Sequence, residues 1–252
     1  MVEGLLDVVA GEWRREDRLR DGTPVVLRSI RPSDREHLAA AFERLSPASR
    51  YLRFHTELDR LSGTQLDFLT RVDHYDHEAV VALDPTAPVQ PGLGIARYVR
   101  DTDEPSIAEA AVTVADEHQG RGVGTLLLGA LAARARAAGI DAFRSYVLDG
   151  NTMMLRVFDD LGATRRRDAG GPWRVDLDLP ELERDVPDSP VGRAFLRIAR
   201  DEHVLISELP PIWSARRRSR RHGYSIDTAD DPIEDERELV AAELERWLAD
   251  RG

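Results

Sequence analysis

The chain has 252 residues, 42% of them hydrophobic, and its formal net charge of −11 argues against broad nucleic-acid binding. This length can hold one domain of ordinary to large size, or one domain with an extension, while no run approaches the ~20 apolar residues that span a bilayer and no signal-peptide core precedes the first element, so we expect a cytoplasmic protein. The absence of cysteine excludes disulfides, a thiolate nucleophile and cysteine-based metal sites.

The N-terminal third predicts one strand followed by three helices. Residues 1–22 are polar, and their one signal is a short helix around residues 5–13. Residues 24–30 are typical of a strand. Three helix starts follow: the capping box Ser33-x-x-Glu36, the pair Ser46-Pro47 with proline at the first helical position, and Thr64-x-x-Asp67.

The rest of the first 180 residues alternates strands and helices. In chain order we expect strands at 78–83 and 93–100 joined by a proline-rich turn at 85–91, a half-buried strand at 107–114, a glycine-rich turn, a helix at 126–138 that ends at Gly139, a strand at 142–148, a helix at 151–161 closed by Gly162, and strands at 163–167 and 173–179. Periodicity alone gives an α/β or α+β fold.

Residues 181–252 lie beyond this alternation. Ser189-Pro190 predicts a helix start, residues 216–221 carry a cluster of arginines, and an acidic run at 227–238 leads into a last helix. We interpret this part as a partly helical, partly disordered extension whose opposite charges meet each other. The alternative is that the arginines dock a partner or a nucleic acid.

The stretch that organises the chain is residues 108–125, a strand, a glycine-rich turn and the start of a helix. Gly120, Gly122 and Gly124 let the backbone bend tightly and bring its N–H groups close to a ligand. Those N–H groups precede a helix, whose N-terminus favours an anion by roughly 0.3–2 kcal/mol. We therefore expect a phosphate group at this turn.

The turn resembles the pyrophosphate loop of the GNAT superfamily of acyl-CoA N-acyltransferases. That loop has the pattern Gln/Arg-x-x-Gly-x-Gly/Ala after a Val-x-Val strand, here residues 119–124 after 112–114. Neither Gly-x-Gly-x-x-Gly nor a Gly-Lys-Ser/Thr loop matches. The resemblance covers residues 24–180 and implies a central mixed, mostly antiparallel sheet of about 6–7 strands flanked by helices. Residues 1–23 then form an N-terminal segment, and 181–252 an extension.

The resemblance implies acetyl-CoA as a co-substrate and no metal cofactor. The strand end would bind the pantetheine arm through the amides of Thr113 and Val114, one of which would polarise the thioester carbonyl. Asn151 would hydrogen-bond the pantetheine arm, or else serve as a helix N-cap. The amides of 119–125 would hold the pyrophosphate, and Arg121 could reach a phosphate directly. The predicted cofactor-binding residues are Val112, Thr113, Val114, Gln119, Gly120, Arg121, Gly122, Val123, Gly124, Thr125 and Asn151.

Glu109 is the predicted catalytic base. Acyl transfer needs a neutral amine, and a lysine with a pKa of about 10.4 must lose a proton at a cost of roughly 4.6 kcal/mol at pH 7. Period-2 alternation places Glu109 on a face with Ala111 and Thr113. Small and apolar neighbours should raise the pKa of this carboxyl, which suits a base. The alternative is a solvent-exposed glutamate of an edge strand.

Two further positions bear on the chemistry. Many members of the superfamily place an acid tyrosine seven residues beyond the asparagine, where this chain has Phe158; Tyr146 is a weak substitute, and solvent can protonate a leaving thiolate whose pKa is about 8.5. The His74/His77 spacing occurs in metal sites, but no third ligand is evident nearby. We interpret that cluster as a polar loop, or as a rim that receives a cationic amine.

The N-terminal part resembles bacterial protein lysine acetyltransferases at residues 28–34 and 46–54, and the catalytic glutamate of that group falls on Glu109. This implies acetylation of protein lysines, and because the chain contains no lysine, such an enzyme could not modify its own side chains. One alternative is a small-amine N-acetyltransferase, which predicts a closed acidic pocket. Another is a non-catalytic acyl-CoA sensor that reports to a partner.

Overall fold

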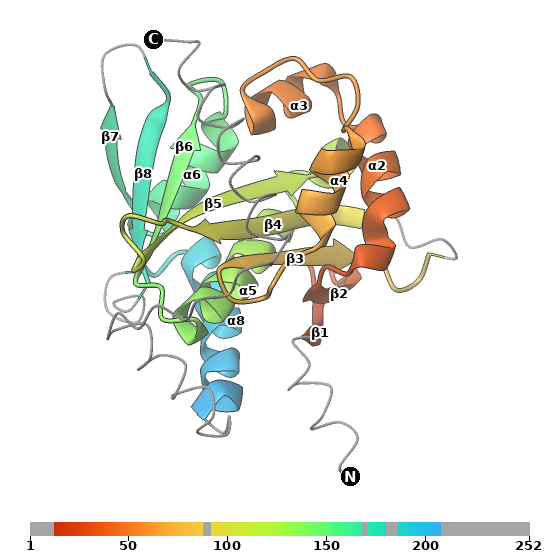
Figure 1. Cartoon of the computed structure of the whole chain (residues 1–252). Helices are drawn as coiled ribbons and strands as arrows, with labels where there is room; N and C mark the ends of the chain where they lie inside the picture. The colour runs from red at the N-terminus through yellow and green to blue at the C-terminus, as the bar shows by residue number, and fades with distance from the viewer. Residues whose placement is uncertain (1–12, 88–91, 168–170, 180–185, 208–252) are drawn as a thin grey trace, which may run out of the picture. The chain divides into compact units, whose positions relative to one another are not determined.

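An eight-stranded sheet in the order β1-β2-β3-β4-β5-β6-β8-β7 forms the centre of the molecule (Figure 1). The computed structural model describes residues 13–87, 92–167, 171–179 and 186–207. Its strands are β1 (Arg14–Arg18), β2 (Pro24–Ser29), β3 (His77–Leu83), β4 (Gly92–Arg100), β5 (Ile107–Val114), β6 (Ala142–Val147), β7 (Thr164–Arg167) and β8 (Trp173–Asp178). All neighbouring strands run antiparallel except β5 and β6, which are parallel. The predicted mixed, mostly antiparallel sheet is confirmed.

The sheet has one strand more than the predicted six or seven, because β1 was not predicted. Arg14–Arg18 consists entirely of charged residues, which gives no apolar alternation to detect. The segment is nevertheless an edge strand that pairs with β2 along its whole length. Its inward-facing Arg15 and Asp17 form an ion pair of 3.3 Å.

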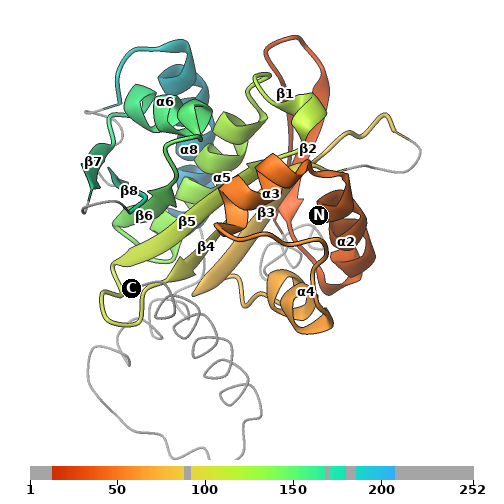
Figure 2. The ribbon, with the colours of Figure 1, turned by 90° about the horizontal axis from the view of Figure 1, so that it is seen from above.

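Helices cover both faces of the sheet (Figures 1 and 2). They are η1 (Pro32–Asp34), α2 (Arg35–Arg44), α3 (Pro47–Phe54), α4 (Gly63–Thr70), η2 (Asp116–His118), α5 (Val123–Ala137), α6 (Thr152–Asp160) and α8 (Pro190–Ser207). Helices α2, α3 and α4 lie on one face, and α5 and α8 lie on the other. Within the described residues, no helix combines the length and the apolar character needed to cross a bilayer.

Two of the three predicted helix starts differ from the structure. Ser46 caps α3 as predicted and accepts a hydrogen bond from the Ser49 amide. The Ser33 capping box is wrong, because Pro32–Asp34 forms a 3₁₀ turn in which Asp34 accepts from the Arg31 amide at 2.9 Å. The third helix starts earlier than predicted, with a capping box between Ser62 and Gln65. The helix predicted at 5–13 lies outside the described residues.

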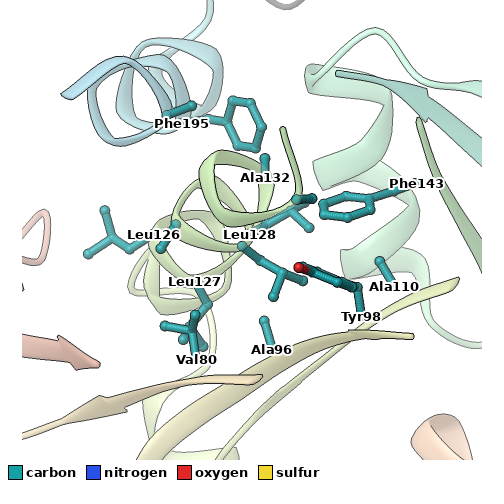
Figure 3. Close-up of a cluster of buried hydrophobic side chains, with 14 of the residues drawn as sticks. Val80, Ala96, Tyr98, Ala110, Leu126, Leu127, Leu128, Ala132, Phe143 and Phe195 are labelled. Atoms are coloured by element: carbon teal, nitrogen blue, oxygen red, sulfur yellow. The ribbon is translucent and has the colours of Figure 1, made fainter. Parts of the chain in front are cut away.

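The core is built around α5, which is buried nearly all round. Its leucines and alanines separate the sheet from α8, and in Figure 3 Leu127 lies toward Val80 while Ala132 lies toward Phe195 of α8. A Cβ at Gly129 would stand 3.0 Å from the Phe195 carbonyl oxygen, so a glycine there permits the close crossing of the two helices. Part of the predicted 181–252 extension therefore packs on the core. The remainder, 208–252, and its predicted charge runs lie outside the described residues.

Candidate active site

The two parallel strands in the middle of the sheet part from each other. The ladder between β5 and β6 joins Ile107–Glu109 to Ala142–Arg144 and ends there, although both strands continue. Figure 1 shows β6 turning away from β5 beyond this point. The Ser145 hydroxyl donates to the Ala110 carbonyl at 2.7 Å just past the ladder. Beyond it, the second half of β5 presents an unpaired edge toward β6.

The register of β5 fixes which backbone groups line that edge. Asp101 N donates to Ile107 O at 3.0 Å, and Ala115 N donates to Leu93 O at 2.9 Å, so the odd-numbered residues of β5 pair with β4. The N–H groups of Val112 and Val114 consequently point toward β6 and into the opening. Thr113 pairs with Ile95 of β4, so the prediction that the Thr113 amide faces the cofactor edge is wrong. Successive amides of a strand point to opposite sides, so an error of one residue in the expected register assigns the wrong amide to the cofactor edge.

The glycine turn joins this edge to the start of α5. Gly120 and Gly122 have φ values of 73° and 92°, in the left-handed region that favours glycine. Gly122 is the N-cap of α5 and has no side chain to satisfy the first-turn amides, which leaves them for a ligand. Val123 and Thr125 are buried, so a cofactor contact of their side chains is not supported, and binding through their backbone groups stays a prediction. A Cβ at Gly124 would meet Val114 at 3.5 Å and Val112 at 3.8 Å, which places the turn directly on the strand edge.

A basic pocket of about 170 Å³ opens beside the start of α5. Four of its lining residues are arginines from three separate elements, and none is acidic: the lining is Arg18, Leu19, Arg20, Arg121, Gly122, Thr125, Leu126, Ala194 and Arg197. The β1–β2 turn and α8 thus bring arginines to a helix N-terminus, where Arg197 of α8 pairs with Asp17 at 2.8 Å. The arginines of this pocket other than Arg121 were not predicted, because they lie about 100 residues before the glycines or more than 70 after them.

Arg121 is held by the β1–β2 turn. Its guanidinium donates to Asp21 at 2.7 Å and to Thr23 at 2.9 Å, and it lies 3.0 Å from His118 Nδ1. Arg20 has no hydrogen bond or ion pair among the described residues, and its side chain lies 3.6 Å from where a Gly122 Cβ would be. Arg20 is therefore the more available cation. A direct contact of Arg121 with a phosphate stays a prediction.

Gln119 and Asn151 both have structural roles in the observed geometry. Gln119 Nε2 donates to Asp116 at 3.0 Å and to the Val114 carbonyl at 3.3 Å. Asp116 in turn accepts from the Ser46 amide at 2.7 Å and from the Ser49 hydroxyl, which ties the start of α3 to the end of β5. Asn151 caps α6 by accepting from the Met154 amide at 3.2 Å. Its contact with a cofactor stays a prediction.

Glu109 lies on the face of β5 opposite α5. It keeps contact with solvent, yet the surrounding protein removes enough water to raise the pKa of its carboxyl above the usual value, as the sequence predicts. The positive charge of Arg53 on α3 opposes that rise, and Asp101 adds to it. In the described part of the chain, Glu109 has no hydrogen bond or ion pair. Its carboxylate is available to an incoming proton donor.

Three aromatic residues bear on whether the protein supplies an acid. Phe158, which stands at the position of the family's tyrosine, is 2% exposed and belongs to the core. Tyr98 is buried, donates to the Tyr75 carbonyl at 3.1 Å and has a pKa raised mainly by burial. Tyr146 is 45% exposed on β6, where it alternates with the buried Ser145 and Val147 and so shares the face of Glu109. Tyr146 alone of these three faces solvent near the base.

The histidine pair is split between two separate contacts. His74 Nδ1 lies 2.9 Å from the buried Glu78, and His77 Nε2 lies 2.8 Å from an Arg97 nitrogen. Among the residues that the structure describes, no group of three or more side chains could hold a metal ion. Glu78 also accepts a hydrogen bond from Arg134 of α5 at 3.0 Å, so these contacts tie β3 to α5 and to β4.

Several known proteins are similar to this chain in sequence, and one solved structure is similar in fold. The model of the acetyltransferase (GNAT) family matches residues 44–163. Acetyltransferase PA5475 of Pseudomonas aeruginosa is 35% identical over 63% of this chain and 85% of its own length. Acetyltransferase Pat of Mycolicibacterium smegmatis is 32% identical over 66% of this chain, which spans about half (49%) of that protein. The crystal structure of the GNAT domain of S. lividans PAT has a TM-score of 0.61 and 35% identity, covering 66% of this chain and 97% of that one.

Proposed function

Because this chain belongs to the GNAT family of acetyltransferases, and is therefore an enzyme that uses acetyl-CoA, we propose that it acetylates lysine side chains of proteins with Glu109 as the general base. The observation that carries this proposal is the parting of β5 and β6. Because the two strands part, the second half of β5 has unpaired amides. The same strand carries Glu109 and leads into the glycine turn.

The cofactor side of the site works through backbone groups. The Val112 and Val114 amides bind the pantetheine arm as an added strand would, and one of them polarises the thioester carbonyl. The first-turn amides of α5 hold the diphosphate, with Arg20 as an additional cation. Because these backbone amides are fixed in the strand, they stabilise the negative charge that develops on the thioester oxygen without having to reorient.

On the acceptor side, Glu109 removes a proton from the substrate ammonium, directly or through a water molecule. The neutral nitrogen then attacks the thioester carbonyl carbon, the C–N bond forms, and the C–S bond breaks. Coenzyme A leaves as a thiolate, and solvent supplies its proton because a thiol pKa of about 8.5 makes the thiolate a tolerable leaving group. A carboxyl whose pKa is raised is a stronger base than a free glutamate.

A protein acceptor is supported by the surroundings of Glu109. Val99 lies directly opposite Glu109 on the neighbouring strand, and it is exposed, as is Tyr146 on the other side. Tyr51 of α3 is also exposed. Large apolar side chains on an open face suit the surface of another protein better than they suit a small polar amine.

The test is incubation with labelled acetyl-CoA and a cell lysate. Since the chain has no lysine, labelled lysines belong to target proteins and not to the enzyme itself. We expect labelled protein bands with the wild type and with Glu36→Gln, an exposed position of α2, and their loss in Glu109→Gln. Label confined to small molecules would reject the protein substrate and favour the small-amine alternative.

A further inference from the structure

Within the described residues, the Arg53 side chain forms no ion pair with a carboxylate. It lies in the last turn of α3, half-buried, with its guanidinium 4.9 Å above the Phe54 ring. Burial lowers its pKa, and Glu109 is the carboxylate whose charge opposes that fall. Neither Arg53 nor Glu109 forms a hydrogen bond or an ion pair with the described residues. Because α3 packs against β5, the two charged side chains belong to neighbouring elements on the same face of the sheet, and each charge acts on the other.

A second arginine shares this face. Arg97 of β4 lies opposite Ala111, so its side chain projects to the same side of the sheet as Glu109. It is 6% exposed and donates to the Leu69 carbonyl at 2.9 Å and to His77, with no carboxylate among its partners. The positive charge of Arg53 lowers the pKa of Arg97 further, although burial is the larger cause.

The next arginine along the face is neutralised. Arg144 of β6 lies beside Glu109 in the ladder and contacts Glu104 at 2.9 Å and Asp176 at 3.2 Å. Among the residues that the structure describes, the acceptor face thus carries two arginines, Arg53 and Arg97, that form no ion pair with a carboxylate, and one carboxylate, Glu109, that forms none with a cation. A ligand that brought only an ammonium group would add a third positive charge. A ligand that also brought a negative group could pair that group with an arginine and its ammonium with Glu109.

We propose that the acceptor of this enzyme carries a carboxylate close to its amine, and that Arg53 binds this carboxylate while Glu109 receives the proton of the amine. In a protein, the carboxylate belongs to an Asp or Glu beside the target lysine. In a small molecule, it belongs to the same compound as the amine. The inference rests on the proposed function, because it assigns a specificity residue to the same acceptor site.

The experiment compares acceptors that differ only in the carboxylate. The first pair is two blocked peptides in which one lysine is flanked by Glu or by Gln, and the second is Nα-acetyl-lysine and its amide. Within each pair the lysine ε-amine is unchanged, so its intrinsic pKa stays close to constant. The enzymes are the wild type, Arg53→Gln, Arg53→Lys, and Arg44→Gln, which removes a charge from an exposed position at the end of α2.

We expect the wild type and Arg44→Gln to prefer the carboxylate-bearing member by roughly 10- to 100-fold in kcat/KM, mainly through KM, since a hydrogen bond to a charged group contributes on this scale. Arg53→Gln should abolish the preference, and Arg53→Lys should keep part of it. Preference within the peptide pair alone assigns the carboxylate to a protein, and preference within the second pair assigns it to a small molecule.

Equal rates within both pairs in the wild type would overturn this inference and leave the proposed function standing. Transfer to none of the four acceptors by an enzyme that labels lysate proteins would overturn it as well. If Arg53 acted only on the pKa of Glu109, Arg53→Gln would change kcat/KM equally for both acceptors of each pair and would shift the pH profile of kcat. Absence of all transfer, in lysate and panel together, would instead reject the proposed function.

Discussion

The two sides of β5 are built in different ways. On the cofactor side, the backbone supplies the contacts: strand amides, a turn with two left-handed glycines, and the first turn of a helix. On the acceptor side, side chains from β4, β5, β6 and α3 meet, among them Arg97, Glu109, Tyr146 and Arg53. A site built from backbone groups can bind the same ligand in proteins of different sequence, whereas a site built from side chains changes when those side chains are substituted. Cofactor identity and acceptor identity are therefore encoded separately in this chain.

The two sides are joined by one polar network. Asp116, just beyond β5, holds Gln119 before the glycine turn and also the Ser46 amide and Ser49 hydroxyl of α3. Burial alone would raise the pKa of Asp116, but the hydrogen bonds from Ser49 and Ser46 bring it below its usual value, so the carboxylate stays ionised at neutral pH. The comparison between the sides is sharpened by variants that damage one and spare the other.

Glu109→Gln should have the largest effect. Removal of a general base lowers the rate by typically 10²- to 10⁴-fold, and we expect that loss in kcat. The affinity for acetyl-CoA should be unchanged, because the Glu109 side chain projects away from α5 and the glycine turn. Steady-state kinetics with calorimetry of acetyl-CoA binding separates the two quantities. A large loss of acetyl-CoA affinity would mean that the two faces are not independent.

The raised pKa of Glu109 gives two pH dependences. The rate should rise with pH through a value above the usual glutamate pKa, as the base ionises. Stability depends on pH in the opposite direction. The folded protein favours the protonated carboxyl of Glu109, so its contribution to the free energy of unfolding is present below the unfolded pKa and is lost as pH rises through the folded pKa. Glu109→Gln should therefore melt at a higher temperature than the wild type at pH 7, and at the same temperature near pH 4.

Gly122→Ala should damage the cofactor side alone. With φ at 92°, a Cβ costs on the order of 1–3 kcal/mol, and relief of that strain would turn the first amides of α5. We expect roughly tenfold weaker acetyl-CoA binding. Gly124→Ala is the matched control, since its Cβ would make ordinary contacts with Val114 and Val112 and alanine favours a helix. Equal losses in the two variants would contradict a role for the left-handed turn.

The local structure of the cofactor side was largely predictable from the sequence, whereas on the acceptor side only Glu109 was. The glycine turn, the span of β5 and the Asn151 cap follow from local patterns of two to six residues. Thr113 was misassigned because the direction of its amide depends on how β5 is paired with β4. A local sequence pattern gives no information on that register. Arg20, Arg53 and Arg97 reach their places only through the packing of separate elements, and charged strands such as β1 have no apolar period.

Arg20→Gln should weaken acetyl-CoA binding by about three- to tenfold at low salt, because it removes one charge from a partly open anion site. The effect should shrink as salt is raised, since screening acts most on exposed charges. Arg14→Gln is the control: Arg14 belongs to the same hairpin but pairs with Glu16 outside the pocket. Titrations at two salt concentrations measure this, and an equal loss in Arg14→Gln would show that only the overall charge matters.

Tyr146→Phe should have the smallest effect, less than about threefold in kcat. Coenzyme A leaves as a thiolate whose conjugate acid has a pKa of about 8.5, so a protein acid contributes little near neutral pH. Phe158 cannot supply one either, because its side chain is buried in the core and a hydroxyl there would lack solvent. Phe158→Tyr should accordingly lower the melting temperature without raising kcat. A hundredfold loss of kcat in Tyr146→Phe near neutral pH, with the alkaline limb of the pH profile abolished, would instead identify Tyr146 as the acid and make proton delivery a property of the acceptor side.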